Sequence, residues 1–437
     1  MKKNNQNLIG FLLLFILPTI MFIVSMLLTN SYIFSIEMFL LLLYFIFIIY
    51  FTKDLFSPFT FFFVNIFLGI VDIFFVATRY RSVVQYYSIG IYEKSLFLIL
   101  LWLFMFYIGF SLKYRNKTNV GDKISKKNDE KRHCFNYSLI IASSFILLFL
   151  IIKVFSTIKN IGKLSMDIAF FDGQGFLVAM FPICGFIPIC FLEEKKKKNA
   201  IISALLVFFV IALSGRRLVA ITTTIFPILT FYNYKIKKIK VKNLYILAVP
   251  IIFFIFLVGN IRMQKSIVYN ENPVLNTIIT LGKYIQYGEN LPDLIYSIDN
   301  GNVKYQGFKY TFRGISGLVP RNFWKNKPDI DYSSITSKLV YGYDRGYGQP
   351  VGQFGWAYLC FGYFGVILSG LITGVISKKI YDWMRKRNDA FSIGLYSLLI
   401  MQIINIFTPE SQLKILLFML FIFFVKIFNL FRRRKYE

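Results

Sequence analysis

Long apolar stretches recur along almost the whole chain, and they leave few folds open to it. A helix needs roughly 20 mainly apolar residues to cross a hydrocarbon core about 30 Å thick. Twelve stretches reach or approach this length, at residues 8–28, 31–51, 57–77, 93–112, 137–157, 174–192, 199–213, 218–233, 243–260, 352–377, 390–408 and 412–430. We therefore predict an all-α polytopic integral membrane protein with about 12 transmembrane helices.

Two details refine this prediction. The stretches 199–213 and 218–233 are short, and only the sequence Ser-Gly-Arg-Arg at 214–217 separates them, which predicts a tight helical hairpin. The first stretch, 8–28, has no small-residue cleavage site after it and is therefore expected to be a helix rather than a cleaved signal peptide.

The basic residues give the predicted helices an orientation. The chain has 50 Lys and Arg against 22 Asp and Glu, a formal net charge of +28. When successive loops are assigned to alternating sides, 29 of these cations fall on one side and seven in the short loops of the other. Because cytoplasmic loops accumulate Lys and Arg, we predict that both termini are cytoplasmic. The same bias explains the positive charge without a nucleic-acid partner, and it favours contact with anionic lipids.

One connection is much longer than the rest, and it divides the chain into three parts. These are residues 1–260 with nine predicted helices, a large extracytoplasmic loop at 261–351, and residues 352–437 with three helices and a basic cytoplasmic tail. The loop carries eleven basic and seven acidic residues and many aromatic ones. Long structured loops are usually functional. Aromatic faces suit sugar rings and membrane interfaces equally well.

The rare residue types exclude several kinds of chemistry. His133 is the single histidine, and the four cysteines offer no disulfide framework. A histidine base, a His-ligated metal or a Cys-His pair is therefore not expected, and no nucleotide-binding or zinc spacing occurs. We expect carboxylates and guanidiniums to carry the function, without a metal or a cofactor.

Three features draw attention among these charged groups. Arg216 and Arg217 lie at the predicted hairpin tip on the outer side, where they could hold a lipid phosphate or extend to ordinary headgroups. Glu37 and Asp72 lie within apolar stretches, where a carboxylate is either functional or paired, for example with Arg79. Glycines recur between 352 and 374, and we interpret them as sites of close helix packing rather than a phosphate loop.

The chain resembles the Wzy-type polysaccharide polymerases of bacterial O-antigen, capsule and exopolysaccharide pathways. The resemblance is carried by the helix topology, by the turn 214–217, and by the segments 307–310, 317–328 and 352–365. It implies a GT-C-like architecture in the cytoplasmic membrane of a bacterium. It also implies a substrate oligosaccharide linked to undecaprenyl pyrophosphate, with a chain-length regulator and a flippase as further partners.

The resemblance also implies roles for individual residues. Guanidiniums would bind the two substrate pyrophosphates: Arg216 and Arg321 first, Arg313 and Arg217 as second choices, and Arg262 and Arg345 in support. A carboxylate would deprotonate the acceptor hydroxyl, and the candidates in falling order are Asp344, Asp329, Glu289 and Asp72.

Other functions share parts of this pattern. An O-antigen ligase-type transferase would have the same architecture, but His133 lies on the predicted cytoplasmic side, away from where ligase chemistry would use it. A flippase or transporter would concentrate polar residues at the membrane midplane, whereas here they gather in one loop and no internal repeat is visible. A polysaccharide-binding scaffold without catalysis differs from these only in activity.

Overall fold

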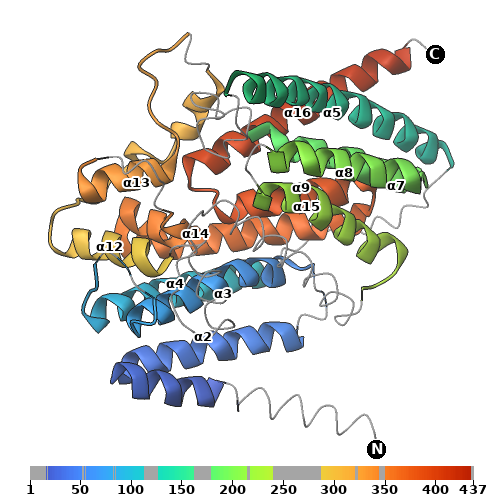
Figure 1. The fold of residues 1–437 in the computed structure, drawn as a ribbon. Coiled ribbons are helices and arrows are strands. Elements are labelled where there is room, and N and C mark those ends of the chain that lie inside the picture. Colours follow the sequence, from blue (N-terminus) through green and yellow to red (C-terminus); the bar gives the residue numbers. More distant parts are fainter. Residues whose placement is uncertain are drawn as a thin grey trace, which may run out of the picture.

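The computed structural model describes residues 18–51, 56–81, 85–112, 126–161, 179–213, 217–239, 287–319, 323–343 and 350–434, together with Ile16, Asp54 and Val83. These residues form helices and connecting turns and contain no strand. The long helices lie along one common direction in a bundle (Figure 1). The α-helices are α2 (Tyr32–Phe51), α3 (Pro58–Ala77), α4 (Ile89–Ser111), α5 (Lys126–Ile161), α7 (Phe186–Glu193), α8 (Lys197–Leu213), α9 (Arg217–Phe231), α12 (Tyr287–Asp299), α13 (Tyr332–Tyr341), α14 (Gly352–Arg387), α15 (Ala390–Ile404) and α16 (Pro409–Arg434).

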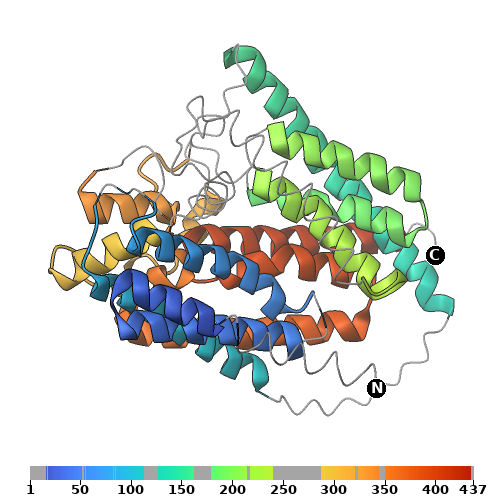
Figure 2. The same ribbon diagram turned by 60° about the horizontal axis from the view of Figure 1, so that its bottom comes forward.

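The described chain also contains a helix at Pro18–Thr29 and several short helical turns. Three are 3₁₀ turns, η2 (Phe181–Gly185), η4 (Gly307–Lys309) and η5 (Arg313–Leu318), and η3 (Tyr232–Ile236) is a π-helical turn that extends α9. In both ribbon views α12, α13 and the connections around them lie at one end of the bundle, and the turn after α7 lies at the opposite end (Figures 1 and 2). We call these the α12 end and the α7 end.

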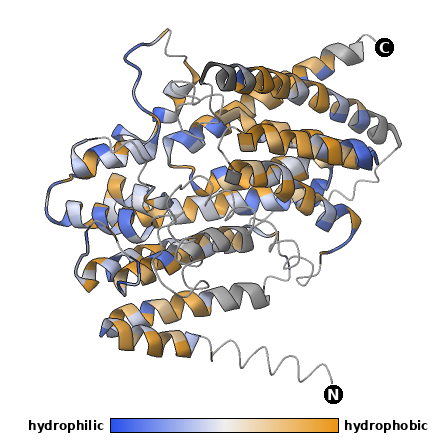
Figure 3. Cartoon of the chain, viewed as in Figure 1, coloured by the Kyte–Doolittle hydropathy of each residue, from blue (hydrophilic) through white to orange (hydrophobic). Residues whose placement is uncertain are grey.

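The helices have the composition that a membrane protein requires. Four are long and apolar enough to cross a bilayer: Ile89–Ser111, His133–Val154, Gly352–Arg387 and Pro409–Leu430. Shorter apolar helices cover Pro18–Thr29, Tyr32–Tyr44, Phe181–Glu193 and Ala390–Ile404. Figure 3 shows the apolar residues concentrated in the long helices. The prediction of a helical membrane protein is confirmed, whereas the number of spans stays a prediction, and the stretch 243–260 lies outside the described residues.

Helices α4 and α14 pack closely along an extensive contact, and glycines make it possible. A Cβ atom on Gly374 would lie 2.2 Å from the carbonyl oxygen of Phe106, and one on Gly370 would lie 2.7 Å from that of Trp102. On the facing helix, a Cβ on Gly109 would lie 2.2 Å from the Leu371 oxygen. The two backbones thus approach more closely than side chains allow. This confirms that Gly370 and Gly374 serve helix packing.

Helix α14 is broken near its beginning and is longer than predicted. Gly362 has φ 61° and ψ −148°, a conformation that is essentially restricted to glycine. The helix then continues to Arg387, ten residues beyond the predicted limit, and ends at Asn388 in the left-handed conformation. The prediction stopped where the apolar stretch ends. The helix continues through the more polar residues 378–387 because its backbone hydrogen bonds do not depend on apolar side chains.

Helices α8 and α9 pack against each other, as the predicted hairpin requires. The turn between them, 214–216, lies outside the described residues, and so does Arg216. Arg217 is the first residue of α9.

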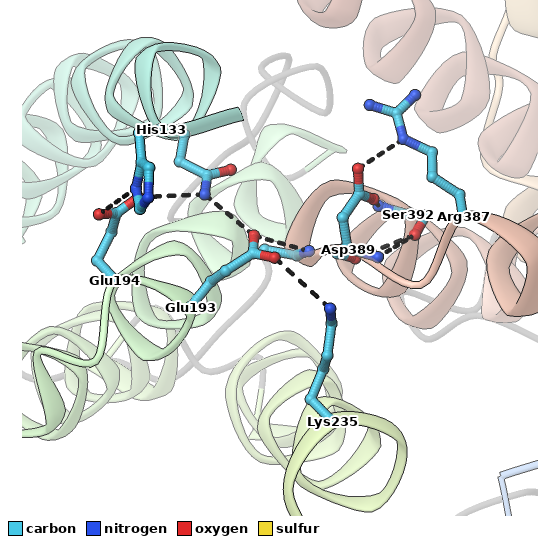
Figure 4. Close-up of polar contacts among 9 residues, drawn as sticks. His133, Glu193, Glu194, Lys235, Arg387, Asp389 and Ser392 are labelled. Atoms are coloured by element: carbon cyan, nitrogen blue, oxygen red, sulfur yellow. Dashed lines mark hydrogen bonds and ion pairs between the residues drawn. The ribbon is translucent and has the colours of Figure 1, made fainter. Parts of the chain in front are cut away.

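Carboxylates hold several helices together at the α7 end (Figure 4). Glu193 accepts hydrogen bonds from Asn136 Nδ2 at 3.0 Å and from the backbone N–H of Ala390 at 2.9 Å, which joins α7 to α5 and α15. The neighbouring Glu194 carboxylate lies 2.7 Å from His133 Nδ1. His133 therefore has a contact that ties α5 to the end of α7.

Candidate functional site

A buried ion-pair network lies where α3, the segment after it and α12 meet. The side chain of Arg81 is only 1% exposed. Its Nη1 donates to Asp72 Oδ1, and its Nη2 lies 3.5 Å from Glu289 Oε2. The backbone N–H of Gly288 donates to Asp72 Oδ2 at 2.7 Å. One guanidinium and one helix N-terminus thus hold Asp72, and the same guanidinium reaches Glu289.

The local backbone explains how Arg81 enters the protein interior. Arg79 has φ 61°, a left-handed conformation that ends α3 and turns the chain back. The N–H of Arg81 then donates to the Phe75 oxygen at 3.0 Å, which fixes the return. At the beginning of α12, a Cβ atom on Gly288 would lie 2.6 Å from the backbone carbonyl oxygen of Asp72. Only glycine therefore lets α12 begin in contact with α3.

The two carboxylates of this network differ in their access to solvent. Both oxygens of Asp72 accept hydrogen bonds, and its side chain is 0% exposed. The Glu289 side chain is 17% exposed. Asp72 is therefore paired with an arginine, which is one of the two alternatives considered from the sequence. Its partner is Arg81 and not Arg79, whose guanidinium lies over the Tyr86 ring. Glu289 can still interact with a molecule outside.

A second carboxylate on α12, Asp293, binds two tyrosine hydroxyls. Tyr87 Oη donates to it at 2.8 Å, and Tyr341 Oη from α13 donates to its other oxygen. Burial, followed by the Asp293 charge and the hydrogen bond to it, raises the pKa of Tyr87 above its usual value. Sequence reasoning missed Asp293 as a candidate, although its spacing of four from Glu289 places both on one helix face.

The beginning of α14 lies next to α12. Asn290 Nδ2 donates to the Pro350 backbone oxygen at 3.3 Å, which joins α12 to the chain two residues before α14. Gln353 is buried, and its Nε2 has no hydrogen-bond partner among the described residues. Asp344 and Arg345 belong to the segment 344–349, which lies outside the described residues.

Arg313 and Asp329 occupy separate positions on the same side. Arg313 is in η5, and its guanidinium lies 4.0 Å from the centre of the Tyr310 ring. Asp329 accepts a hydrogen bond from Lys338 Nζ at 2.8 Å, and both side chains are exposed. An exposed ion pair of this kind is held only weakly.

The structure thus brings together two of the predicted site residues, Asp72 and Glu289, through Arg81, which was not predicted. Arg313 and Asp329 lie at the α12 end without joining that network. Of the remaining candidates, the structure gives only the backbone of Arg217, and four guanidiniums and one carboxylate lie outside the described residues: Arg216, Arg262, Arg321, Arg345 and Asp344.

Fold and site together define a class: a polytopic helical membrane protein that carries carboxylates and guanidiniums in a structured segment over one end of its bundle. The model of the family described as O-antigen polysaccharide polymerase Wzy matches residues 9–434. The chain therefore belongs to this family, and the resemblance found in the sequence is confirmed. No curated protein and no solved structure matches the chain. Membership supports an enzymatic role in polymerising repeat units of a polysaccharide.

Proposed function

We propose that the protein joins oligosaccharide repeat units, each linked to undecaprenyl pyrophosphate, into an O-antigen, capsule or exopolysaccharide. The family match over residues 9–434 is the observation that carries this proposal. The reaction takes place at the extracytoplasmic face of the cytoplasmic membrane, where we place the α12 end. The distribution of basic residues in the sequence supports that orientation.

The transfer requires two kinds of group. The acceptor hydroxyl forms a bond to the anomeric carbon of the donor sugar while the bond from that carbon to the pyrophosphate breaks. Guanidiniums can stabilise the charge on the departing pyrophosphate without a metal. We assign Arg216 and Arg321 to the pyrophosphates, with Arg313 and Arg217 as second choices and Arg262 and Arg345 in support.

A carboxylate accepts the proton of the acceptor hydroxyl, and the contacts separate the candidates. Asp72 is enclosed, with both oxygens bound. Asp329 is paired with Lys338 at the surface. Glu289 combines a fixed position beside Arg81 with access from outside, which favours it among the described carboxylates. Asp344, which precedes α14 closely in sequence, remains the other candidate.

Chain-length analysis of the lipid-linked glycan tests this function. Cells that lack the gene would be complemented with the wild type, Arg216→Lys, Arg216→Ala or Arg321→Ala, and the protein level would be measured in each. We expect single repeat units in the deletion strain and loss of polymer in the variants at an unchanged protein level. Unchanged polymer length and amount with Arg216→Lys would remove Arg216 from the site.

Two other outcomes would assign a different function. Polymer that still forms on the carrier but does not reach its final acceptor would identify a ligase. Repeat units that remain on the cytoplasmic leaflet would identify a flippase and would exclude the catalytic roles of both arginines.

A further inference from the structure

Four large apolar side chains project from the segment that connects α12 to α13. Phe308 is 71% exposed, Phe312 63%, Ile315 57% and Phe323 85%. We call these four residues the apolar rim. A soluble surface rarely exposes apolar groups so densely, and such a patch usually marks an interaction site.

The inner side of this segment is fixed to the beginning of α16. A Cβ atom on Gly314 would lie 2.4 Å from the Pro409 oxygen, and one on Gly317 would lie 2.8 Å from Leu413 Cδ2. Gln412 Nε2 also donates to the Thr311 oxygen. Because Pro409–Leu430 is long and apolar enough to cross a bilayer, these contacts hold the rim at the level where a spanning helix begins.

A second spanning helix, α14, continues the rim. The Phe308 ring centre lies 4.8 Å from that of Phe361, which is located at the break in this helix. One turn further, Phe364 is 66% exposed on the outside of the same helix. The rim is therefore continuous with side chains that face the surroundings of the bundle and not with a polar loop surface.

The charge of the segment complements a lipid surface. Between Asp299 and Asp329 the sequence has no acidic residue, but it has six basic ones. Lys309 and Lys325 are exposed beside the rim. Apolar and aromatic residues on one side with Lys and Arg beside them are typical of segments that lie in the membrane interface.

We infer that residues 307–319 and 323–324 lie in the membrane interface at the α12 end. The apolar rim is inserted at the boundary between headgroups and acyl chains, at a depth of roughly 5–10 Å, and Lys309 and Lys325 face lipid phosphates. This connection is then a membrane-anchored part of the protein and not a freely solvated loop. The inference does not depend on the proposed polymerase reaction, because it rests on packing, exposure and charge alone.

Depth-dependent fluorescence quenching tests this position in the full chain. The protein would be placed in nanodiscs of phosphatidylethanolamine and phosphatidylglycerol, and Trp324→Phe would serve as the background. The other tryptophans Trp102, Trp356 and Trp383 contribute a constant emission that the background measures. Phe312→Trp then adds a probe in the rim. The matched control is Asn302→Trp, in the exposed turn after α12.

We expect lipids brominated near the headgroup to remove most of the emission added by Phe312→Trp, and lipids brominated near the chain ends to remove little. Iodide in the aqueous phase should quench Asn302→Trp but not Phe312→Trp. Quenching of Phe312→Trp by iodide and not by bromine would overturn the inference. Protection from iodide by a soluble repeat-unit oligosaccharide, without bromine quenching, would assign the rim to glycan binding and would also overturn it. Ile315→Trp provides the same test if Phe312→Trp does not fold.

Discussion

The guanidinium of Arg81 neutralises a carboxylate that is enclosed by protein, so its loss is expected to affect stability strongly. Arg81→Ala leaves the buried Asp72 charge without a cation, a change that costs about 3–5 kcal/mol in comparable cases. The measurement is the fraction of detergent-solubilised protein that stays monodisperse after heating. Arg79→Ala is the matched control, because Arg79 is exposed. Equal heat resistance of the two variants would contradict the structural role of Arg81.

Glu289 has a different role in the same network, and its test separates function from stability. Glu289→Gln keeps the shape of the side chain but removes its capacity to accept a proton as a base. We expect polymer to be lost while the protein level and the heat resistance stay near those of the wild type. Asp299→Asn, at the other end of α12, is the control and should retain polymer. Normal polymer with Glu289→Gln would leave Asp344 as the base.

Tyr87 predicts how stability depends on alkaline pH. Its pKa is raised in the folded protein, whereas in the unfolded chain it is about 10. The unfolded state therefore loses its proton first, so the stability that Tyr87 contributes is fully present below pH 10 and declines as the pH rises above it. The difference in heat resistance between the wild type and Tyr87→Phe should shrink above about pH 10. A difference that is constant up to pH 11 would contradict this assignment.

For single residues, the sequence predicted which buried carboxylate needs a partner but not which arginine provides it. Asp72 stands out because it interrupts an apolar stretch. Arg79 and Arg81 both follow Asp72 within nine residues, and only the left-handed turn at Arg79 decides which of them enters the interior. Glu289 joins them from a position 208 residues beyond Arg81, and no local pattern encodes such a contact.

At the scale of helices, the contact between α4 and α14 allows a direct test. Gly374→Ala places a methyl group 2.2 Å from the Phe106 oxygen, a backbone atom that cannot move independently of α4. We expect a loss of stability of about 1–3 kcal/mol, measured as reduced heat resistance in detergent. Gly90→Ala is the control, because the nearest atom to its Cβ, Glu93 Oε2, would be 3.9 Å away. Similar losses in both variants would show that close packing is not the cause.

The apolar stretches predicted most helices well, since α3 covers Pro58–Ala77 where 57–77 was expected. They did not predict α12 and α13, because both helices are mixed in polarity and Pro292 lies inside α12. The break in α14 was not predicted, because several glycines follow one another there and only the fold selects Gly362. Tertiary contacts, not local pattern, decide these points.

At the scale of the whole molecule, the orientation in the membrane can be tested with single cysteines. Cys184, Cys190 and Cys360 are buried, so Cys134→Ser gives a background with little reactive thiol. Asn302→Cys marks the α12 end and Lys195→Cys marks the α7 end. A membrane-impermeant maleimide added to intact spheroplasts should label only Asn302→Cys. Labelling of Lys195→Cys alone would reverse the predicted orientation.

The packing of α4 on α14 also has a consequence for biogenesis. A ribosome finishes α4 long before it begins α14, yet Gly109 of α4 is packed closely against that late partner. Until α14 is made, Gly109 lacks its packing partner, and until α12 is made, the Arg81 network lacks Glu289 and the Gly288 N–H. Early translation products therefore expose surfaces whose partners are still missing, and such incomplete chains are prone to misassembly. A chain that stops before residue 350 should be degraded as a whole and should not accumulate as a stable fragment.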